Sequence, residues 1–161
     1  MLKPQPNSKT TRLEPLGRQL VFTAKAMREA FEATLARAGG SLGSWIVMSA
    51  IAEVHGMTQA ALAVHAHLEG ATITHHVDRL EKAGLVRRVL DPGDRRVRRL
   101  ELTPAGVELH ARMMTAVVQL QTVVMAGLKQ DEKAVMIRCL ELIQANLAAS
   151  GAPAPAPERL A

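Results

Sequence analysis

One hairpin between helical regions limits the folds open to this chain. Two strand-like runs of Val, Leu and Arg, residues 86–90 and 97–102, flank an Asp-Pro-Gly-Asp segment at residues 91–94. Pro, Gly and Asp favour a tight turn, so we expect the two runs to pair as an antiparallel hairpin. Apolar residues on both sides recur at helical spacings, which predicts a mainly α chain with a small β-hairpin.

Composition supports a single helical core. The chain has 161 residues, 48% of them hydrophobic, which is enough for one domain. Its aromatic residues are two Phe and one Trp, so Leu, Val, Ala, Ile and Met must fill the core, which favours helices over a β-sandwich. No run approaches about 18 uncharged apolar residues, and no apolar segment follows the first lysines. We therefore expect a cytoplasmic, nucleoid-associated protein with no membrane contact.

The positive charge is concentrated in one segment. Between Arg79 and Arg99 there are eight basic and three acidic side chains, an excess equal to the net charge of +5 of the whole chain. A focused positive field attracts polyanions, with nucleic acid the first candidate, because phosphate contacts dominate such binding. The alternative is a charged face that meets only solvent.

Apolar spacing and end signals predict six helices. We expect them at residues 13–38, 41–54, 59–65, 70–83, 104–128 and 131–147. The expected N-caps are Ser41, Thr58, Thr103 and Asp131, and the expected C-terminal stops are Gly39 and Gly84.

These elements divide the chain into four parts. A flexible N-terminus is expected at residues 1–11 and a disordered Pro/Ala tail at residues 150–161. Residues 12–38 and 107–149 form a helical region, and residues 41–106 form a second unit that includes the hairpin at 86–102.

The helix at about residues 70–83 has two different faces. Ile73, Val77 and Leu80 form one apolar stripe, whereas Ala71 and His75 point away from it. Preceded by a short helix and a tight turn, it predicts a helix-turn-helix whose outer face can approach base edges in a major groove. The alternative is an ordinary helical hairpin whose polar face meets water. The hairpin that follows directly, in the position of a wing, favours the DNA-binding interpretation.

Four segments together resemble the MarR family of bacterial winged-helix transcription regulators: MTQAALA at residues 57–63, TITHHVDRLEKAGLV at 72–86, DPGDRR at 91–96 and LTPAG at 102–106. The resemblance implies a non-enzymatic homodimer in which the first and last two helices form the dimerisation region. It also implies that two winged lobes straddle successive major grooves of a pseudo-palindromic site on double-stranded DNA. An isologous interface would bury the apolar faces of the terminal helices.

The resemblance also implies DNA-contacting residues. Four positions of the recognition helix would face bases and Arg79 a phosphate, while Thr58 and Gln59 would meet phosphate at the start of the supporting helix. We further expect Asp94 to fix the wing turn and pair with an arginine, while Arg95 or Arg96 enters the minor groove. Arg98 and Arg99 are expected to play a supporting part. The base-facing set is Ala71, Thr72, Thr74 and His75.

Family resemblance implies an effector as well. Many members bind small aromatic or phenolic anions and then release DNA, which predicts a repressor of this kind. The candidate lining residues are Met27, Trp45, Met48 and Met113. The alternative for this Met-rich set is plain core packing.

Two alternatives remain open beside an effector-released repressor. His55, His65, His67 and the pair His75-His76 raise the alternative of a zinc-responsive regulator, although no cysteine lies nearby and we expect no metal or other cofactor. A winged-helix interaction module that does not read DNA is the second alternative. The sequence contains no nucleophile elbow, phosphate-binding Gly loop or HExxH pattern, so we expect no enzyme.

The single cysteine, Cys139, falls on the apolar face of the last helix. We expect it to be a buried structural residue, because inert packing is the usual fate of a lone cysteine on such a face.

Overall fold

The computed structural model describes residues 15–66 and 68–151. The predicted flexible segment at residues 1–11 and residues 152–161 of the predicted tail lie outside the described residues, as does His67. Six helices and two strands follow one another in the described part. They are α1 (Pro15–Arg37), α2 (Leu42–Glu53), α3 (Gln59–His65), α4 (Gly70–Lys82), β1 (Val86–Leu90), β2 (Arg98–Leu102), α5 (Pro104–Val124) and α6 (Gln130–Ala149).

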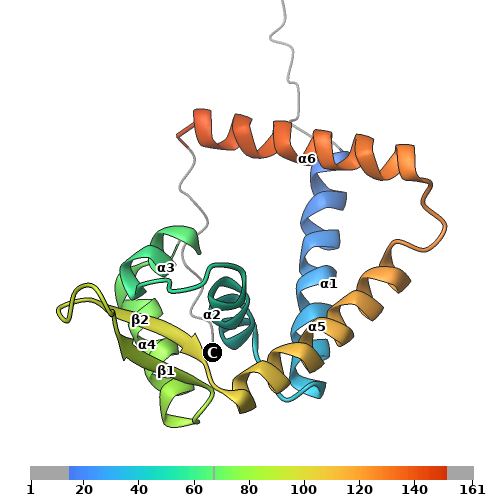
Figure 1. Cartoon of the computed structure of the whole chain (residues 1–161). Helices are drawn as coiled ribbons and strands as arrows, with labels where there is room; N and C mark the ends of the chain where they lie inside the picture. The colour runs from blue at the N-terminus through green and yellow to red at the C-terminus, as the bar shows by residue number, and fades with distance from the viewer. Residues whose placement is uncertain (1–14, 67, 152–161) are drawn as a thin grey trace, which may run out of the picture.

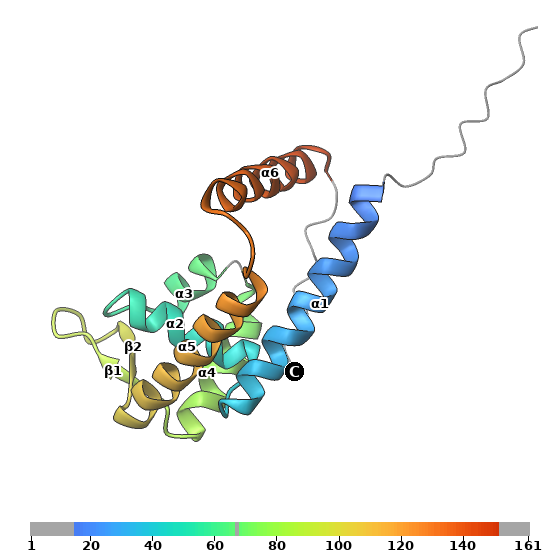
Figure 2. The same ribbon diagram turned by 90° about the vertical axis from the view of Figure 1, so that its right-hand side faces the viewer.

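The elements form a compact lobe with long helices leading away from it. Helices α2, α3 and α4 and the β1–β2 hairpin lie together, and we call this group the winged lobe (Figure 1). Helix α5 runs from the lobe alongside α1, and α6 stands clear of the lobe in both views (Figures 1 and 2). Mainly α architecture with one two-stranded antiparallel wing is thus confirmed.

Side-chain caps set the starts of α2, α3 and α5. The hydroxyl oxygens of Ser41, Thr58 and Thr103 accept hydrogen bonds from the backbone N–H groups three residues later, at 3.2, 3.2 and 3.1 Å. These caps are the predicted ones, and they satisfy donors that a helix start would otherwise leave unpaired. Gly39 and Gly84 follow α1 and α4 with φ of 90° and 70°, a conformation that favours glycine at helix ends.

The predicted cap of the last helix is wrong. Helix α6 is capped by Lys129 rather than Asp131, and Asp131 lies inside its first turn. The backbone N–H of Lys129 donates to Glu132 Oε2 at 2.7 Å, so the glutamate three residues on fixes the start earlier in the chain.

The hairpin has one continuous register. Val86 pairs with Leu102 and Leu90 with Arg98, so β2 begins one residue later than predicted. Val97 belongs to the turn instead, because its N–H donates to the carbonyl of Asp94 at 2.9 Å and its own carbonyl accepts from Asp91 at 3.0 Å.

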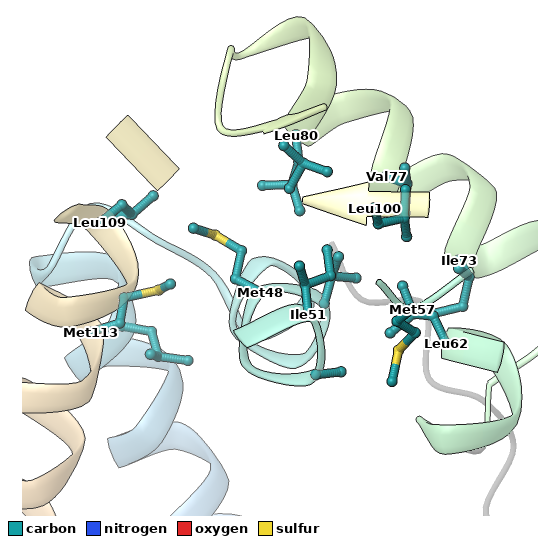
Figure 3. Packing of buried hydrophobic residues seen from close by; sticks show 14 residues of the cluster. Met48, Ile51, Met57, Leu62, Ile73, Val77, Leu80, Leu100, Leu109 and Met113 are labelled. Atoms are coloured by element: carbon teal, nitrogen blue, oxygen red, sulfur yellow. The ribbon is translucent and has the colours of Figure 1, made fainter. Parts of the chain in front are cut away.

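A single hydrophobic cluster holds the winged lobe to α5. Leu62 of α3, Ile73 and Val77 of α4 and Leu100 of β2 are fully or almost fully buried in it. Figure 3 shows Met48 of α2 lying between this group and the α5 side chains Leu109 and Met113. The predicted stripe on α4 is therefore confirmed as the core face of that helix.

The two terminal helices contribute little to this core. Leu35 is the buried apolar residue of α1, whereas Leu16 and Phe22 are 61% and 62% exposed. No residue of α6 is buried, and Cys139 is exposed, so its predicted burial is wrong for the single chain. Helical periodicity correctly indicated an apolar surface, but none of the elements at residues 15–66 and 68–151 of one chain covers it. None of the helices in the described ranges has the length and apolarity of a membrane span.

Gly106 occupies a position that no other residue fits. It lies in the first turn of α5, and a Cβ atom added there would be 2.0 Å from the carbonyl oxygen of Leu85. The neighbour is backbone of the turn between α4 and β1, so the clash cannot be relieved by a side-chain rotation. The glycine thereby lets α5 begin directly against the winged lobe.

We predict that Gly106→Ala lowers the free energy of unfolding by about 1–3 kcal/mol, the usual range for overpacking. Gly70→Ala is the matched control, because a Cβ there would meet nothing within 4 Å. Chemical denaturation of both variants measures the difference. Equal stability of the two variants would contradict the close approach of α5 to Leu85.

Candidate nucleic-acid interface

Helix α4 presents a small, polar outer face. Ala71, His75 and Arg79 are exposed, and Thr72 and Thr74 are half-buried. Its inner face buries Ile73, His76, Val77 and Leu80 against the cluster. The five predicted contact positions of this helix thus lie away from its core face. The size and polarity of this outer surface fit the approach of a helix to base edges.

Thr74 is engaged inside the protein. Its hydroxyl donates to the carbonyl of Gly70 at 2.8 Å and accepts from Gln59 Nε2 at 2.6 Å. Gln59 Oε1 in turn accepts from Arg88 Nη2 at 3.1 Å. Gln59, predicted to meet phosphate, therefore links α3 to α4, and Thr58 caps α3 with its hydroxyl.

Arg88 is a residue that sequence reasoning missed. From β1 its guanidinium reaches two carboxylates of α4, with Nη2 to Asp78 Oδ1 at 2.6 Å and Nη1 paired with Glu81. Burial lowers the pKa of Arg88, but its bonds to Asp78 and Glu81 raise it more, so the group stays charged. The wing, α3 and α4 are therefore tied together by one side chain that is 20% exposed.

The wing turn is held by Asp91, not by Asp94 as predicted. Asp91 Oδ1 accepts from the backbone N–H groups of Gly93 and Asp94 at 2.7 and 3.1 Å, and its Oδ2 pairs with Arg99. These backbone bonds and the Arg99 guanidinium lower the pKa of the Asp91 carboxyl. The Asp94 side chain accepts only from the backbone N–H of Arg96, at 2.9 Å, and has no ion pair among the described residues.

Arg99 anchors the wing to the rest of the lobe. Its Nη1 donates to the carbonyl of Gly56 at 2.7 Å, while the N–H of Leu100 donates to the carbonyl of Met57 at 2.8 Å. Arg95, Arg96 and Arg98 are exposed, and their side chains form no ion pair in the described part of the chain. The arginines thus separate into anchors and free charges, with the free ones at or beside the wing tip.

The histidines that the structure describes are not grouped as a metal site would require. Among the described residues no three His, Cys, Asp or Glu side chains come together in a way that could hold a metal ion. His76 is buried, and burial, followed by the charges of His75 and Arg79, lowers its pKa. His65 lies 3.6 Å from Glu53, and His67 lies outside the described residues.

Two of the predicted effector residues lie in the hydrophobic core, and the other two lie on α1 and at the contact of α2 with α1 and α5. Met48 and Met113 are fully buried in the cluster, and Met27 is half-buried on α1. Trp45 stands edge-on to Phe31, with ring centroids 5.9 Å apart, and stacks on His110 at 5.8 Å. His110, which sequence reasoning missed, also lies 3.2 Å from Ser49 Oγ through Nε2. Burial lowers the pKa of His110 against an opposing effect of Glu53.

Comparison with known proteins identifies this architecture. The MarR family model matches residues 39–97, which cover most of the winged lobe. The solved structure of the transcriptional regulator PA3341 is 32% identical, with a TM-score of 0.69 over 83% of this chain and 98% of that chain. The chain belongs to the MarR family.

Two further relatives carry more specific descriptions. A putative transcriptional regulatory protein for the hcr operon of Thauera aromatica is 34% identical over 103 residues, or 64% of this chain and 62% of that protein. CouR from Rhodococcus jostii RHA1, solved with p-coumaroyl-CoA, is 27% identical, with a TM-score of 0.70 over 81% of this chain and 92% of that chain. The matched segments span 43% to 62% of the length of the curated relatives.

The ion pair of Asp91 predicts a pH-dependent contribution to stability. The pKa of this carboxyl is lower in the native than in the unfolded chain. Its full contribution to the free energy of unfolding is therefore present above the unfolded pKa of about 3.9, and it is lost as pH falls through the native pKa. Asp91→Asn keeps the acceptor for Gly93 but removes the charge that Arg99 needs.

We therefore expect wild type to be more stable than Asp91→Asn at pH 6, with the difference shrinking on acidification from about pH 5 toward pH 3. Thermal melts across this range measure it, and Asp94→Asn, which carries no ion pair in the described structure, serves as the control. A difference that does not change with pH would contradict the role of the Asp91–Arg99 pair.

Proposed function

We propose that this chain is a DNA-binding transcription regulator whose winged lobe reads a duplex through α4 and the wing. The observation that carries the proposal is the separation of its arginines. Arg87, Arg88 and Arg99 are paired with carboxylates, whereas Arg79, Arg95 and Arg96 carry exposed charge with no ion pair in the described structure. Unpaired guanidinium groups beside a small polar helix face suit phosphates and a minor groove.

We also propose individual contacts. Ala71, Thr72 and His75 are assigned to base edges, and Thr74 contributes mainly its methyl group because its hydroxyl is already bonded twice. Arg79 and the start of α3, with Thr58 and Gln59, are assigned to phosphates. Arg95 and Arg96 are assigned to the minor groove, with Asp94 ordering the backbone between them.

We also propose a homodimer built by residues 12–38 and 107–149, with residues 41–106 as the DNA-binding region. The support is the uncovered apolar surface of α6, where Val135, Ile137 and Leu142 are 61%, 58% and 54% exposed. A helix that is apolar on several sides is stable when other elements bury it. A second copy of α1, α5 and α6 supplies such elements in a two-fold arrangement.

Repression relieved by a small aromatic effector is the proposed mode of regulation. Trp45 and His110 lie where α2 of the winged lobe meets α5, with Phe31 of α1 against the indole. A ligand stacked on these rings would change the angle between the lobe and the long helices. CouR, which is similar to this chain, holds p-coumaroyl-CoA, and this supports an aromatic acid or its CoA thioester as the class.

Arg96→Ala is predicted to weaken binding to a duplex from the upstream region of its own gene by about 1–3 kcal/mol. Arg87→Ala is the matched control, since Arg87 pairs with Glu101 at 2.7 Å within the hairpin. Fluorescence anisotropy at several salt concentrations measures both affinities. The absence of salt-sensitive duplex binding, or an equal loss in the two variants, would contradict the proposal.

Leu142→Glu is predicted to shift the protein from twice the 17.4 kDa of one chain toward a single chain, because it places a charge on the apolar surface of α6. Gln144→Glu adds the same charge at another exposed position of that helix and should leave the dimer intact. Light scattering after size exclusion distinguishes them. A Leu142→Glu protein that stays dimeric would exclude this part of α6 from the interface.

Aromatic carboxylates and their CoA thioesters are expected to raise the melting temperature of the wild type, because a ligand that binds only the folded state stabilises it. The rise should fall by at least half in His110→Gln and stay unchanged in His65→Gln, whose ring is exposed on α3. A screen without any stabilising compound, or an equal rise in both variants, would contradict the effector site at the Trp45–His110 stack.

A further inference from the structure

Arg98, at the start of β2, is an exposed arginine that has no part in the contacts proposed above. In the register of the hairpin it lies opposite Leu90, two residues beyond the pair of Arg88 with Leu100. Side chains two residues apart on a strand share one face of a sheet, as do side chains directly opposite each other. These four residues therefore belong to the same face of the wing.

This face of the wing is turned toward the recognition helix. Leu100 is buried in the hydrophobic cluster, and Arg88 pairs with two carboxylates of α4. Toward the tip the face becomes open, because Leu90 is 53% exposed and Arg98 is exposed as well. The loop that follows projects beyond α3 and α4 in both views (Figures 1 and 2). Arg98 thus lies at the open end of the gap between the wing and the recognition helix.

The neighbouring carboxylates leave the charge of Arg98 unbalanced. Asp91 pairs with Arg99, which lies on the opposite face of β2, and Glu101 pairs with Arg87. The side chain of Arg98 forms no ion pair within residues 15–66 and 68–151. An exposed arginine beside carboxylates that are already paired leaves its positive charge available to a polyanion.

A duplex that meets both elements places one of its backbones at this gap. When α4 lies in a major groove and the wing tip in the adjacent minor groove, the strand that separates the two grooves runs between them. The phosphates of that strand pass the inner face of the wing near its tip. Arg98 is the basic residue that the hairpin register places on this open part of the face.

We propose that Arg98 binds a phosphate of the strand that separates the two grooves. Its methylene groups lie along the exposed Leu90 opposite, as the stems of long basic side chains do on apolar surface, and its guanidinium donates to the phosphate oxygens. Such a contact carries no sequence information, but it fixes the position of the protein on the duplex. It rests on the proposed DNA-binding function and adds a residue that sets the spacing between the two reading elements.

Fluorescence anisotropy at several salt concentrations tests the contact, with the upstream duplex and with a shuffled duplex of the same composition. Arg98→Gln should weaken binding to both by a similar factor, about three- to tenfold near 0.1 M salt, and lower the slope of log affinity against log salt by about 0.9. Arg98→Lys keeps the charge and should retain the wild-type slope. Arg87→Gln is the matched control, because Arg87 lies on the opposite face of the hairpin and pairs with Glu101, and it should change the slope by less than about 0.3.

Single methylphosphonate linkages in the upstream duplex locate the phosphate, because each replaces one backbone charge with a neutral group. In each half-site we expect one linkage, between the major-groove and minor-groove contacts, that weakens binding of the wild type but not of Arg98→Gln. Arg87→Gln should lose affinity there as the wild type does. Equal losses for the wild type and Arg98→Gln at every linkage would overturn the contact.

An unchanged salt slope in Arg98→Gln, or an equal fall in Arg87→Gln, would also overturn the contact while leaving the proposed function in place. The absence of salt-sensitive duplex binding by the wild type would instead overturn the function on which the contact rests. Both glutamine variants change exposed side chains, and melting temperatures equal to that of the wild type confirm that they are folded.

Discussion

The guanidinium of Arg88 holds together the parts of the lobe that are proposed to meet DNA. It extends from β1 to Asp78 and Glu81 on α4 and to Gln59 on α3, and through Gln59 it also reaches Thr74. Its fork of donors can bond several acceptors at once, which a lysine could not do in the same geometry. Wing and recognition helix therefore keep one relative orientation.

This pairing also determines which charges remain free. Carboxylates near the hairpin form ion pairs with particular arginines. Glu101 pairs with Arg87 and Asp91 with Arg99, in addition to the two carboxylates that pair with Arg88. The positive field seen in the sequence is thus reduced to a few unpaired guanidinium groups. They lie on the outer face of α4 and around the tip of the wing, where a polyanion can reach them.

Local signals in the sequence were sufficient for the framework of the fold. Caps at Ser41, Thr58 and Thr103 and the stripe on α4 each depend on residues within a few positions, and all appear as predicted. The predicted role of Asp94 failed because the choice between two nearby carboxylates depends on Arg99, which the hairpin brings to Asp91 from the other strand.

Longer-range features escaped the sequence for the same reason. Arg88 and His110 gain their importance from partners on other elements, and nothing adjacent to them in the chain marks it. Cys139 shows a different limit, since periodicity predicts that a surface is apolar but not which element covers it. In the described part of a single chain that surface of α6 is uncovered, which is the basis of the proposed dimer.

Hydroxyl-radical footprinting of a bound duplex tests the central claim most directly, namely that two winged lobes read one site. The account predicts two protected stretches on one face of the duplex, about one helical turn or ~10 base pairs apart, each with an adjoining minor-groove protection from a wing. A single protected stretch would contradict the dimeric arrangement, and uniform protection along the duplex would contradict reading by α4.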